Sequence, residues 1–223
     1  KIGAELGFAM RNPSIAVLPH PLNVKHGRAP PLQLWKLRED VVDRSRSPVL
    51  LVVGANEVPL RELPARYHEL CERVGPLPPP RTIAIDHGRQ RFLLFALPQL
   101  QQAGPGKGEC TTPAIAWIEH PAVGTRVGRR FEVSGWAFKD GVGLRAIWVT
   151  VDGRRVAKAE YGLPSVGPSI IWPFSNDPQH PRIGYRAQVD LEDMPGGRHW
   201  LGLWLVGRDG SVEPWSETPI DLR

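Results

Sequence analysis

The sequence of 223 residues contains no apolar run near the ~18 residues that would suggest a membrane span. Its seven histidines and two cysteines offer neither an H-x-x-x-H nor a C-x-x-C spacing, which argues against a structural zinc site. No Asn-x-Ser/Thr sequon is present, because Asn12 is followed by Pro13. We therefore expect no metal site and no N-glycan on this chain.

The chain lacks both an initiator methionine and a signal peptide. Its first residues, KIGAELGFAM, have no basic region leading into an apolar core and a cleavage site. We therefore expect Lys1 to follow a cut inside a larger protein, with any membrane or targeting segment upstream.

Cysteine is scarce, with only Cys71 and Cys110 present. The two side chains are either reduced core residues or one disulfide formed in an oxidising compartment. If they are paired, they close a loop of about 40 residues, which stabilises the fold by roughly 4 kcal/mol in the chain-entropy model. Such a bond would tie the end of the first half of the chain to the start of the second.

Positive charge is unevenly distributed, although the net charge is only +5. Residues 1–109 hold 15 Lys or Arg against 10 Asp or Glu, whereas residues 110–223 hold 13 against 13. The excess is either a solvated basic surface or a surface that attracts lipid headgroups or phosphates. Nucleic acid is not expected as a partner, because no basic run alternates with exposed aromatic residues.

The first half, residues 1–97, alternates the apolar patterns of helices and buried strands. The clearest strand is 48–53, an uninterrupted apolar run typical of parallel strands that are buried on both faces. The expected elements are a helix at the N-terminus, a strand at 15–18, a helix at 32–42, a strand at 48–53, a helix at 60–74 and strands at 82–85 and 92–95. This order predicts a small α/β three-layer domain with a mostly parallel sheet.

Residues 98–113 are rich in Gly, Pro and Gln and are interpreted as a linker. The second half, residues 114–223, consists of short strand-like runs separated by turn signals such as Asp152-Gly153 and Asp209-Gly210. This pattern predicts an all-β sandwich of immunoglobulin type. In the run 199–206 both faces are apolar, so this strand is expected to be central.

Two short motifs suggest a cofactor or a nucleophile but do not support either. Residues 141–146 fit G-x-G-x-x-A, yet a β-strand pattern follows where dinucleotide binding requires a helix. Ser165 lies in a stretch like a nucleophile elbow, but position 163 is leucine instead of glycine. We expect no cofactor and no catalytic residue in this chain.

The proline-rich segment 18–35 carries the best candidates for contact with a substrate or phosphate. Between the predicted strand and the following helix it would lie at the carboxyl edge of an α/β sheet, where ligands gather. Cationic side chains there could contact phosphate, and a histidine could carry a proton. A plain loop that satisfies its own backbone is the alternative. The candidate residues are His20, Asn23, Lys25, His26 and Arg28.

Seven of the eight tryptophans lie in the second half. Exposed aromatic rings would suit a sugar-binding face, since the apolar side of a pyranose packs on a ring. The alternative is that most of them fill the core of a small sandwich. Trp172 and Trp215, next to prolines, are the candidates for carbohydrate contact.

Two segments of the chain resemble known bacterial families. Residues 1–97 resemble the soluble region that follows the last membrane helices of dolichyl-phosphate-mannose-type glycosyltransferases. Residues 130–210 resemble an immunoglobulin-like module attached to envelope and glycosyltransferase proteins. The first likeness is carried by residues 1–8, 20–23, 26–28 and 34–35, and the second by residues 134–137, 151–153, 161–164, 184–185 and 195–197.

The resemblance implies a non-catalytic, periplasmic part of a membrane enzyme that moves sugar from a polyprenyl-phosphate donor to an envelope acceptor. The acidic catalytic residues of that family lie in membrane-proximal loops, and none of them can be assigned to this chain. The implied partners are an upstream transmembrane region of the same protein and a polyprenyl-phosphate sugar or envelope glycan. A stand-alone periplasmic carbohydrate-binding or scaffold module is the alternative function.

Overall fold

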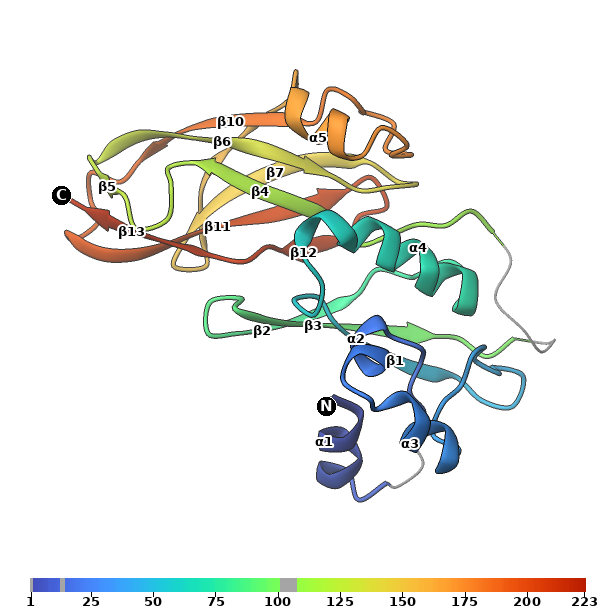
Figure 1. Cartoon of the computed structure of the whole chain (residues 1–223). Helices are drawn as coiled ribbons and strands as arrows, with labels where there is room; N and C mark the ends of the chain where they lie inside the picture. The colour runs from blue at the N-terminus through green and yellow to red at the C-terminus, as the bar shows by residue number, and fades with distance from the viewer. Residues whose placement is uncertain (1, 13–14, 101–107) are drawn as a thin grey trace.

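The computed structural model describes residues 2–12, 15–100 and 108–223, and most of its regular structure is β (Figure 1). In this described part a three-stranded sheet belongs to the first half of the chain, and two larger sheets belong to the second half. The predicted domain boundaries fall between β3 (Gln90–Leu97) and β4 (Ile115–His120), in a segment that is only partly described.

The small sheet is antiparallel throughout, so the predicted α/β three-layer domain with a mostly parallel sheet is wrong. Its order is β1 (Val49–Gly54), β3 and β2 (Arg81–Ile85), and both pairings of β3 are antiparallel. The apolar run of β1 suggested burial on both faces, yet Leu50 is 60% exposed. Only the face that carries Leu93 and Phe95 is closed, because a single long helix covers it.

That helix is α4 (Leu63–Val74), which follows the 3-10 turn η1 (Leu60–Glu62) and matches the helix predicted at 60–74. Pro64 occupies the first turn, where its missing N–H costs nothing, and Gly75 ends the helix with φ +84°. The inward side chains follow helical spacing and pack on the small sheet. They are Leu63, Tyr67, Leu70, Cys71 and Val74.

The N-terminal region differs from the prediction. It contains three short helices, α1 (Ile2–Ala9), α2 (Pro21–Lys25) and α3 (Ala29–Leu34). The predicted strand at 15–18 is reduced to a single bridge between Val17 and Arg38. The helix predicted at 32–42 is wrong because prolines start it at 29 and Lys36, with φ +55°, turns the chain out of helical geometry.

The second half forms the expected β-sandwich. One sheet has the order β4, β6 (Arg130–Phe138), β10 (Gly184–Asp190) and β9 (Glu160–Leu163). The other has the order β5 (Arg126–Val127), β13 (Thr218–Leu222), β11 (Gly197–Gly207), β7 (Leu144–Val151) and β8 (Arg154–Lys158), with β12 (Val212–Pro214) on β11. The helix α5 (Val166–Ile171) follows β9.

Strand β11 is central in its sheet, as its two apolar faces indicated. Leu201, Leu203 and Leu205 point into the sandwich and are buried, while Trp200 and Trp204 lie half-buried on the outer face. Alternation with period two therefore places leucine in the core and tryptophan outside.

The two halves share a hydrophobic core. Ile115, Trp136 and Phe138 of the sandwich belong to the same buried cluster as Leu70 of α4 and Phe95 of β3. The tip of the β2–β3 hairpin also contacts the sandwich, since Ser216 Oγ donates a hydrogen bond to the Gly88 carbonyl at 3.1 Å. The described halves are thus packed against each other at more than one place.

Candidate functional site

The segment from 18 to 35 folds through its own side chains and prolines. The Nδ1 atom of His20 accepts a hydrogen bond from the Leu22 N–H at 3.1 Å, which caps α2, and Pro21 takes the first helical position. Because the small sheet is antiparallel and none of the described residues before this segment forms a strand, the reasoning that placed it at a carboxyl sheet edge was wrong.

The structure separates the five candidate residues into two groups. His20 and Asn23 line a small groove of about 230 Å³ together with Arg38 of the following loop and Glu69 of α4. The side chains of Lys25, His26 and Arg28 are exposed and do not line this groove. The five residues therefore do not converge on one site that could bind a single phosphate.

The groove contains charges that already have partners within the chain. Arg38 Nη2 lies 2.9 Å from Asp40 Oδ1, and Glu69 accepts hydrogen bonds from Arg66 at 2.6 Å and from Arg73 at 3.2 Å. Burial acts to raise the pKa of the Glu69 carboxyl, but these two guanidinium groups outweigh it and lower the pKa. The carboxylate is consequently held in its charged form.

His20 is a second titratable group of the groove, beside Glu69. Its Nε2 atom lies 3.6 Å from Glu57 Oε2. Burial, followed by the charge of Arg66, lowers the pKa of His20 below 6.5 in spite of this carboxylate. The imidazole is therefore neutral at pH 7, with Nδ1 accepting from the backbone and Nε2 carrying the proton. The groove therefore offers hydrogen bonds to a polar ligand. The described residues that line it include no serine, threonine or cysteine that could serve as a nucleophile next to His20.

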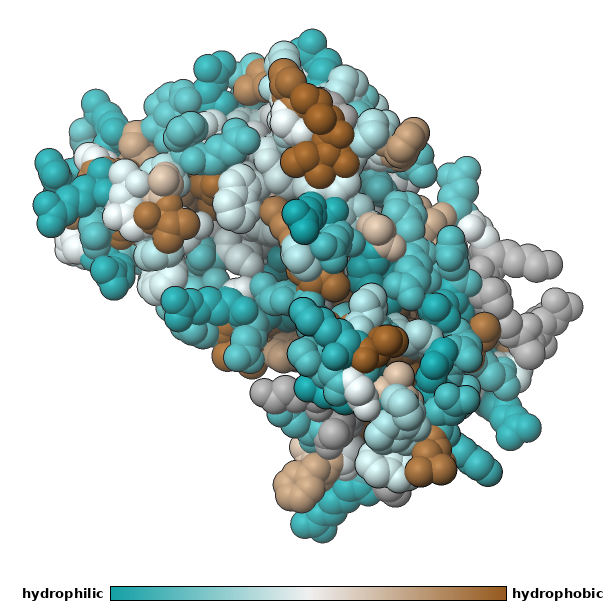
Figure 2. Space-filling model, viewed as in Figure 1, coloured by the Kyte–Doolittle hydropathy of each residue, from teal (hydrophilic) through white to brown (hydrophobic). Residues whose placement is uncertain are grey.

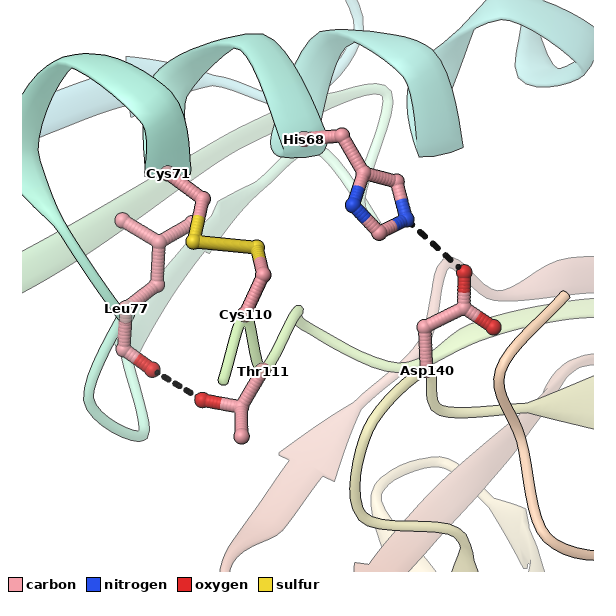
Figure 3. Close-up of a disulfide and its surroundings, with 6 residues drawn as sticks. All are labelled: His68, Cys71, Leu77, Cys110, Thr111 and Asp140. Carbon is pink, nitrogen blue, oxygen red and sulfur yellow. Dashed lines mark hydrogen bonds and ion pairs between the residues drawn. A yellow bond between two sulfur atoms is a disulfide. The ribbon is translucent and has the colours of Figure 1, made fainter. Parts of the chain in front are cut away.

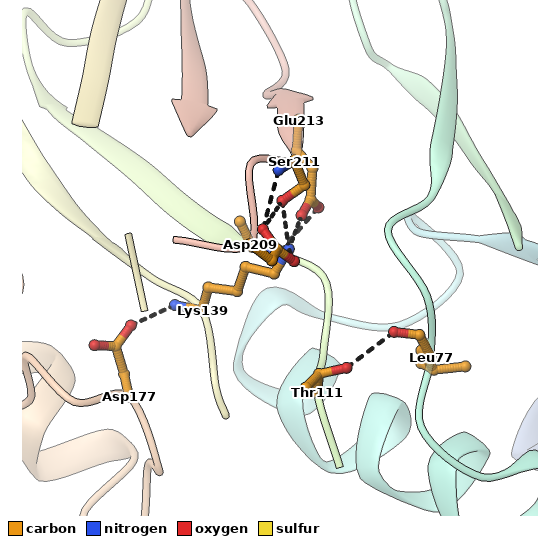
Figure 4. A network of polar contacts seen from close by, with 8 residues as sticks. Leu77, Thr111, Lys139, Asp177, Asp209, Ser211 and Glu213 are labelled. Atoms are coloured by element: carbon orange, nitrogen blue, oxygen red, sulfur yellow. Dashed lines mark hydrogen bonds and ion pairs between the residues drawn. The ribbon is translucent and has the colours of Figure 1, made fainter. Parts of the chain in front are cut away.

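A buried ammonium group lies in the sandwich near the junction of the halves (Figure 4). Lys139 Nζ donates hydrogen bonds to Asp209 at 3.0 Å, to Ser211 at 2.7 Å and to Glu213 at 2.7 Å. The other oxygen of Glu213 accepts from the Ala114 N–H at 2.9 Å. Every donor of the ammonium has a partner, which is how a buried charge is tolerated. The network fixes the start of β4 to the β11–β12 turn.

Asp140 connects α4 to the sandwich (Figure 3). Its Oδ2 lies 3.1 Å from His68 Nε2, and its Oδ1 accepts from Ser175 Oγ at 2.5 Å. The carboxylate lies between the hydroxyl and the imidazole, whereas a nucleophilic serine needs the imidazole next to it. This trio is therefore a structural link. No local pattern indicates this link, because His68 and Asp140 are 72 positions apart in the sequence.

Cys71 of α4 and Cys110 form a disulfide, with the two Cα atoms 6.0 Å apart (Figure 3). Beside it, Thr111 Oγ1 donates a hydrogen bond to the Leu77 carbonyl at 3.0 Å. Of the two possibilities that the sequence left open, the structure contains the bonded one. The bond attaches the segment that leads into β4 directly to α4.

The two tryptophans predicted to contact carbohydrate lie at the junction and are half-buried. Trp172 Nε1 donates to the Arg61 carbonyl at 3.0 Å, and its ring meets Trp136 edge-on at a centroid distance of 5.1 Å. The Arg91 guanidinium lies 4.1 Å from the ring centroid of Trp215. Both rings are thus already engaged by groups of this chain.

A different aromatic pair lies on the outer face of the sandwich. Trp148 of β7 and Trp204 of β11 are directly opposite in the antiparallel register and are both half-buried. Arg155 of β8 lies 5.1 Å and 5.4 Å from their ring centroids. The sequence signal that could have found this pair is the alternation of tryptophan and leucine along β11.

The described residues contain neither a metal-ligand cluster nor a helix that could span a membrane. No group of three or more His, Cys, Asp or Glu side chains there is arranged to hold a metal ion. None of the helices described has the length and apolar content to cross a bilayer.

Comparison with known proteins gives no family for this chain. No protein-family model matches it, and no curated protein does. Among solved structures, an endo-β-1,4-mannanase from Thermotoga petrophila aligns at 14% identity and TM-score 0.34, covering 50% of this chain and 20% of the enzyme. Fibronectin(III)-like modules of Clostridium thermocellum CbhA align at 14% identity and TM-score 0.32, covering 49% and 46%.

A third structure, the Bacteroides ovatus mixed-linkage glucan utilization locus protein SGBP-B in complex with a mixed-linkage heptasaccharide, aligns at 10% identity and TM-score 0.22. It covers 64% of this chain and 35% of that one. This chain thus spans less than half the length of each of these three proteins. At these TM-scores the alignments carry no argument about function, and they assign the chain to no family.

Proposed function

We propose that this chain is a non-catalytic, extracytoplasmic part of a bacterial membrane glycosyltransferase. The whole protein would move a sugar from a polyprenyl-phosphate donor to an envelope acceptor, on the periplasmic side of the inner membrane. The observation that carries the proposal is the sequence resemblance of residues 1–97, and the immunoglobulin-like resemblance of the sandwich belongs to the same proposal.

The disulfide between Cys71 and Cys110 supports an extracytoplasmic location, because such bonds persist in oxidising compartments. The disulfide also favours a structural role for the sandwich. Together with the shared core and the Asp140 link, it holds the sandwich and α4 as one body. In this proposal the sandwich is a rigid outer piece, and the segment from His20 to Arg28 faces the membrane-bound part of the enzyme.

The test uses the complete gene product in isolated membranes. Replacing Lys25, His26 and Arg28 together by alanine is expected to lower sugar transfer from the polyprenyl-phosphate donor by about tenfold, because three cationic or proton-carrying contacts are lost. The matched control replaces Arg154 and Lys158, which are exposed on the far sheet. Equal transfer by the two variants would show that these three side chains play no part in sugar transfer. Absence of transfer by the unmodified protein would refute the proposal that it is a glycosyltransferase.

A second function, docking of envelope glycan, is favoured by the pair Trp148 and Trp204. Two neighbouring rings on a sheet face suit the apolar side of a sugar, provided that Arg155 swings aside. Titration of the chain with envelope polysaccharide should then change tryptophan fluorescence, and the W148A variant should lose the response. No change at millimolar sugar would exclude this function.

A further inference from the structure

Large apolar side chains are exposed in the N-terminal region. Phe8, in the last turn of α1, is 90% exposed, and Trp35, which ends α3, is 66% exposed. Met10 and Leu34, next to them in the sequence, are exposed as well. We call these four residues, with the cations Arg11 and Lys36 beside them, the N-terminal surface. Exposed apolar side chains of this size, all within the first 35 residues of the chain, indicate a surface that binds a partner.

Three residues of the N-terminal surface, Phe8, Arg11 and Trp35, lie around one hollow. Phe8, Arg11, Leu32 and Trp35 line an open groove of about 750 Å³ between α1 and α3. Most of the remaining lining is glycine, alanine and aliphatic side chains. In the space-filling view this end of the molecule shows brown apolar atoms next to teal polar ones (Figure 2). The rings of Phe8 and Trp35 therefore line the same groove.

The charge of this region is one-sided. The four described cations of the region, Arg11, Lys25, Arg28 and Lys36, are all exposed. Residues 1–36 contain five basic residues, which are Lys1, Arg11, Lys25, Arg28 and Lys36. Glu5 is the one acidic residue in the same stretch of sequence. Such an excess attracts anions at a distance of about one Debye length, ~10 Å at 0.1 M salt.

A second apolar patch provides a comparison. Around α5, Val166, Ile170 and Phe174 are just as exposed, with Phe174 at 90%. Residues 164–178, however, contain no Lys or Arg. The two patches share apolar exposure and differ in charge, so only the N-terminal surface complements an anionic partner.

We propose that the N-terminal surface lies against an anionic phospholipid bilayer. Tryptophan, phenylalanine and leucine enter the boundary between headgroups and acyl chains, and neighbouring Lys and Arg side chains reach the lipid phosphates. Each cation near the surface adds to the attraction. A protein partner would have to supply both an apolar ridge and an acidic rim. An anionic bilayer supplies an apolar layer and negatively charged headgroups over its whole surface. This inference does not depend on the transferase.

The experiment is flotation of the chain with phospholipid vesicles. Vesicles of phosphatidylcholine with about one third phosphatidylglycerol should carry the chain at low salt, and binding should fall by at least about tenfold at ~0.5 M salt. Vesicles of phosphatidylcholine alone should bind weakly. The variant Phe8→Ser/Trp35→Ser should lose binding to both, and Arg11→Ala/Lys36→Ala should lose only the preference for anionic vesicles.

The matched control is Phe174→Ser, which removes an equally exposed ring from the patch without cations. It should bind anionic vesicles like the parent chain. An equal loss of vesicle binding in Phe174→Ser and in Phe8→Ser/Trp35→Ser would indicate nonspecific hydrophobic adsorption and would overturn the proposal. Absence of flotation with either vesicle would overturn it too and leave a protein as the occupant. All variants change exposed side chains, so thermal unfolding should coincide with that of the parent.

Discussion

His87, at the tip of the β2–β3 hairpin, stacks flat on Trp200 of the sandwich, with ring centroids 3.5 Å apart and planes inclined by 3°. The same imidazole lies 2.7 Å from Glu217 through Nδ1, and its backbone carbonyl accepts the Glu217 N–H at 2.9 Å. The ring stack, the side-chain hydrogen bond and the backbone hydrogen bond meet at one residue. The hairpin is therefore attached to the sandwich at the end of the junction opposite to the disulfide.

Replacing His87 by alanine is expected to lower the free energy of unfolding by about 1 kcal/mol, since the stack is lost and the half-exposed hydrogen bond to Glu217 adds little. Urea denaturation measures the loss. His26→Ala, in an exposed turn, is the control and should change stability by less than about 0.5 kcal/mol. Equal stability of the two variants would mean that the stack does not hold the hairpin.

His199 predicts a pH dependence of stability. Its Nδ1 lies 2.7 Å from Asp152 Oδ2 and its Nε2 lies 2.8 Å from the Pro195 carbonyl, so both ring nitrogens face acceptors and the charged imidazolium satisfies both. The hydrogen bond to Asp152 raises the pKa of His199 above 6.5, against an opposing effect of burial.

Because the folded pKa of His199 is the higher one, its stabilisation is full below pH 6.5 and is lost as pH rises through the folded value. Unfolding free energies measured in steps upward from about pH 5.5 should decline in this window. The His199→Asn variant, which does not titrate, should show a flatter profile. A parent profile that rises through the same window would contradict the assignment.

Removing the disulfide is expected to cost roughly 4 kcal/mol, since the cysteines are 39 positions apart and the open chain gains loop entropy when unfolded. Guanidinium denaturation of Cys71→Ser/Cys110→Ser against the oxidised parent measures this cost. Adding reductant to the parent should reproduce the loss and should leave the double variant unaffected. Identical curves for parent and variant would show that the bond contributes nothing.

Replacing Lys139 by methionine should destabilise the chain by about 3 to 5 kcal/mol, because Glu213 then stays buried as an unpaired charge. The double variant Lys139→Met/Glu213→Gln should recover part of that loss. The exposed pair of Arg130 and Asp190, 2.9 Å apart, is the comparison, and Arg130→Ala should cost less than about 1 kcal/mol. Thermal unfolding at neutral pH distinguishes these cases.

The parts of the fold that the sequence predicted are those coded locally. Helix α4 carries an apolar face at helical spacing and a glycine stop, and the strands predicted at 82–85 and 92–95 lie within β2 and β3. The direction of strand pairing is not coded locally. An apolar run such as β1 fits a parallel and an antiparallel neighbour equally well, and the hairpin that supplies β3 decided the outcome.

The candidate site was harder to predict for the same reason. His20 and Asn23 were chosen for their chemistry, and they do share a groove, but its other wall comes from Glu69 on a distant helix. The link between His68 and Asp140 joins residues far apart in the chain, and Trp172 is half-buried by partners that only the tertiary packing brings near. Contacts of this kind leave no pattern in the sequence.

The disulfide also determines how the chain would respond to mechanical load. A pull applied through the two termini would pass from α4 across the sulfurs of Cys71 and Cys110 directly into β4, bypassing β2 and β3. The 39 positions between the cysteines would then be removed from the stretched contour, a shortening of roughly 130 Å at 3.3–3.6 Å per residue. Strands inside this closed loop could detach from their neighbours under tension without being drawn out along the direction of force.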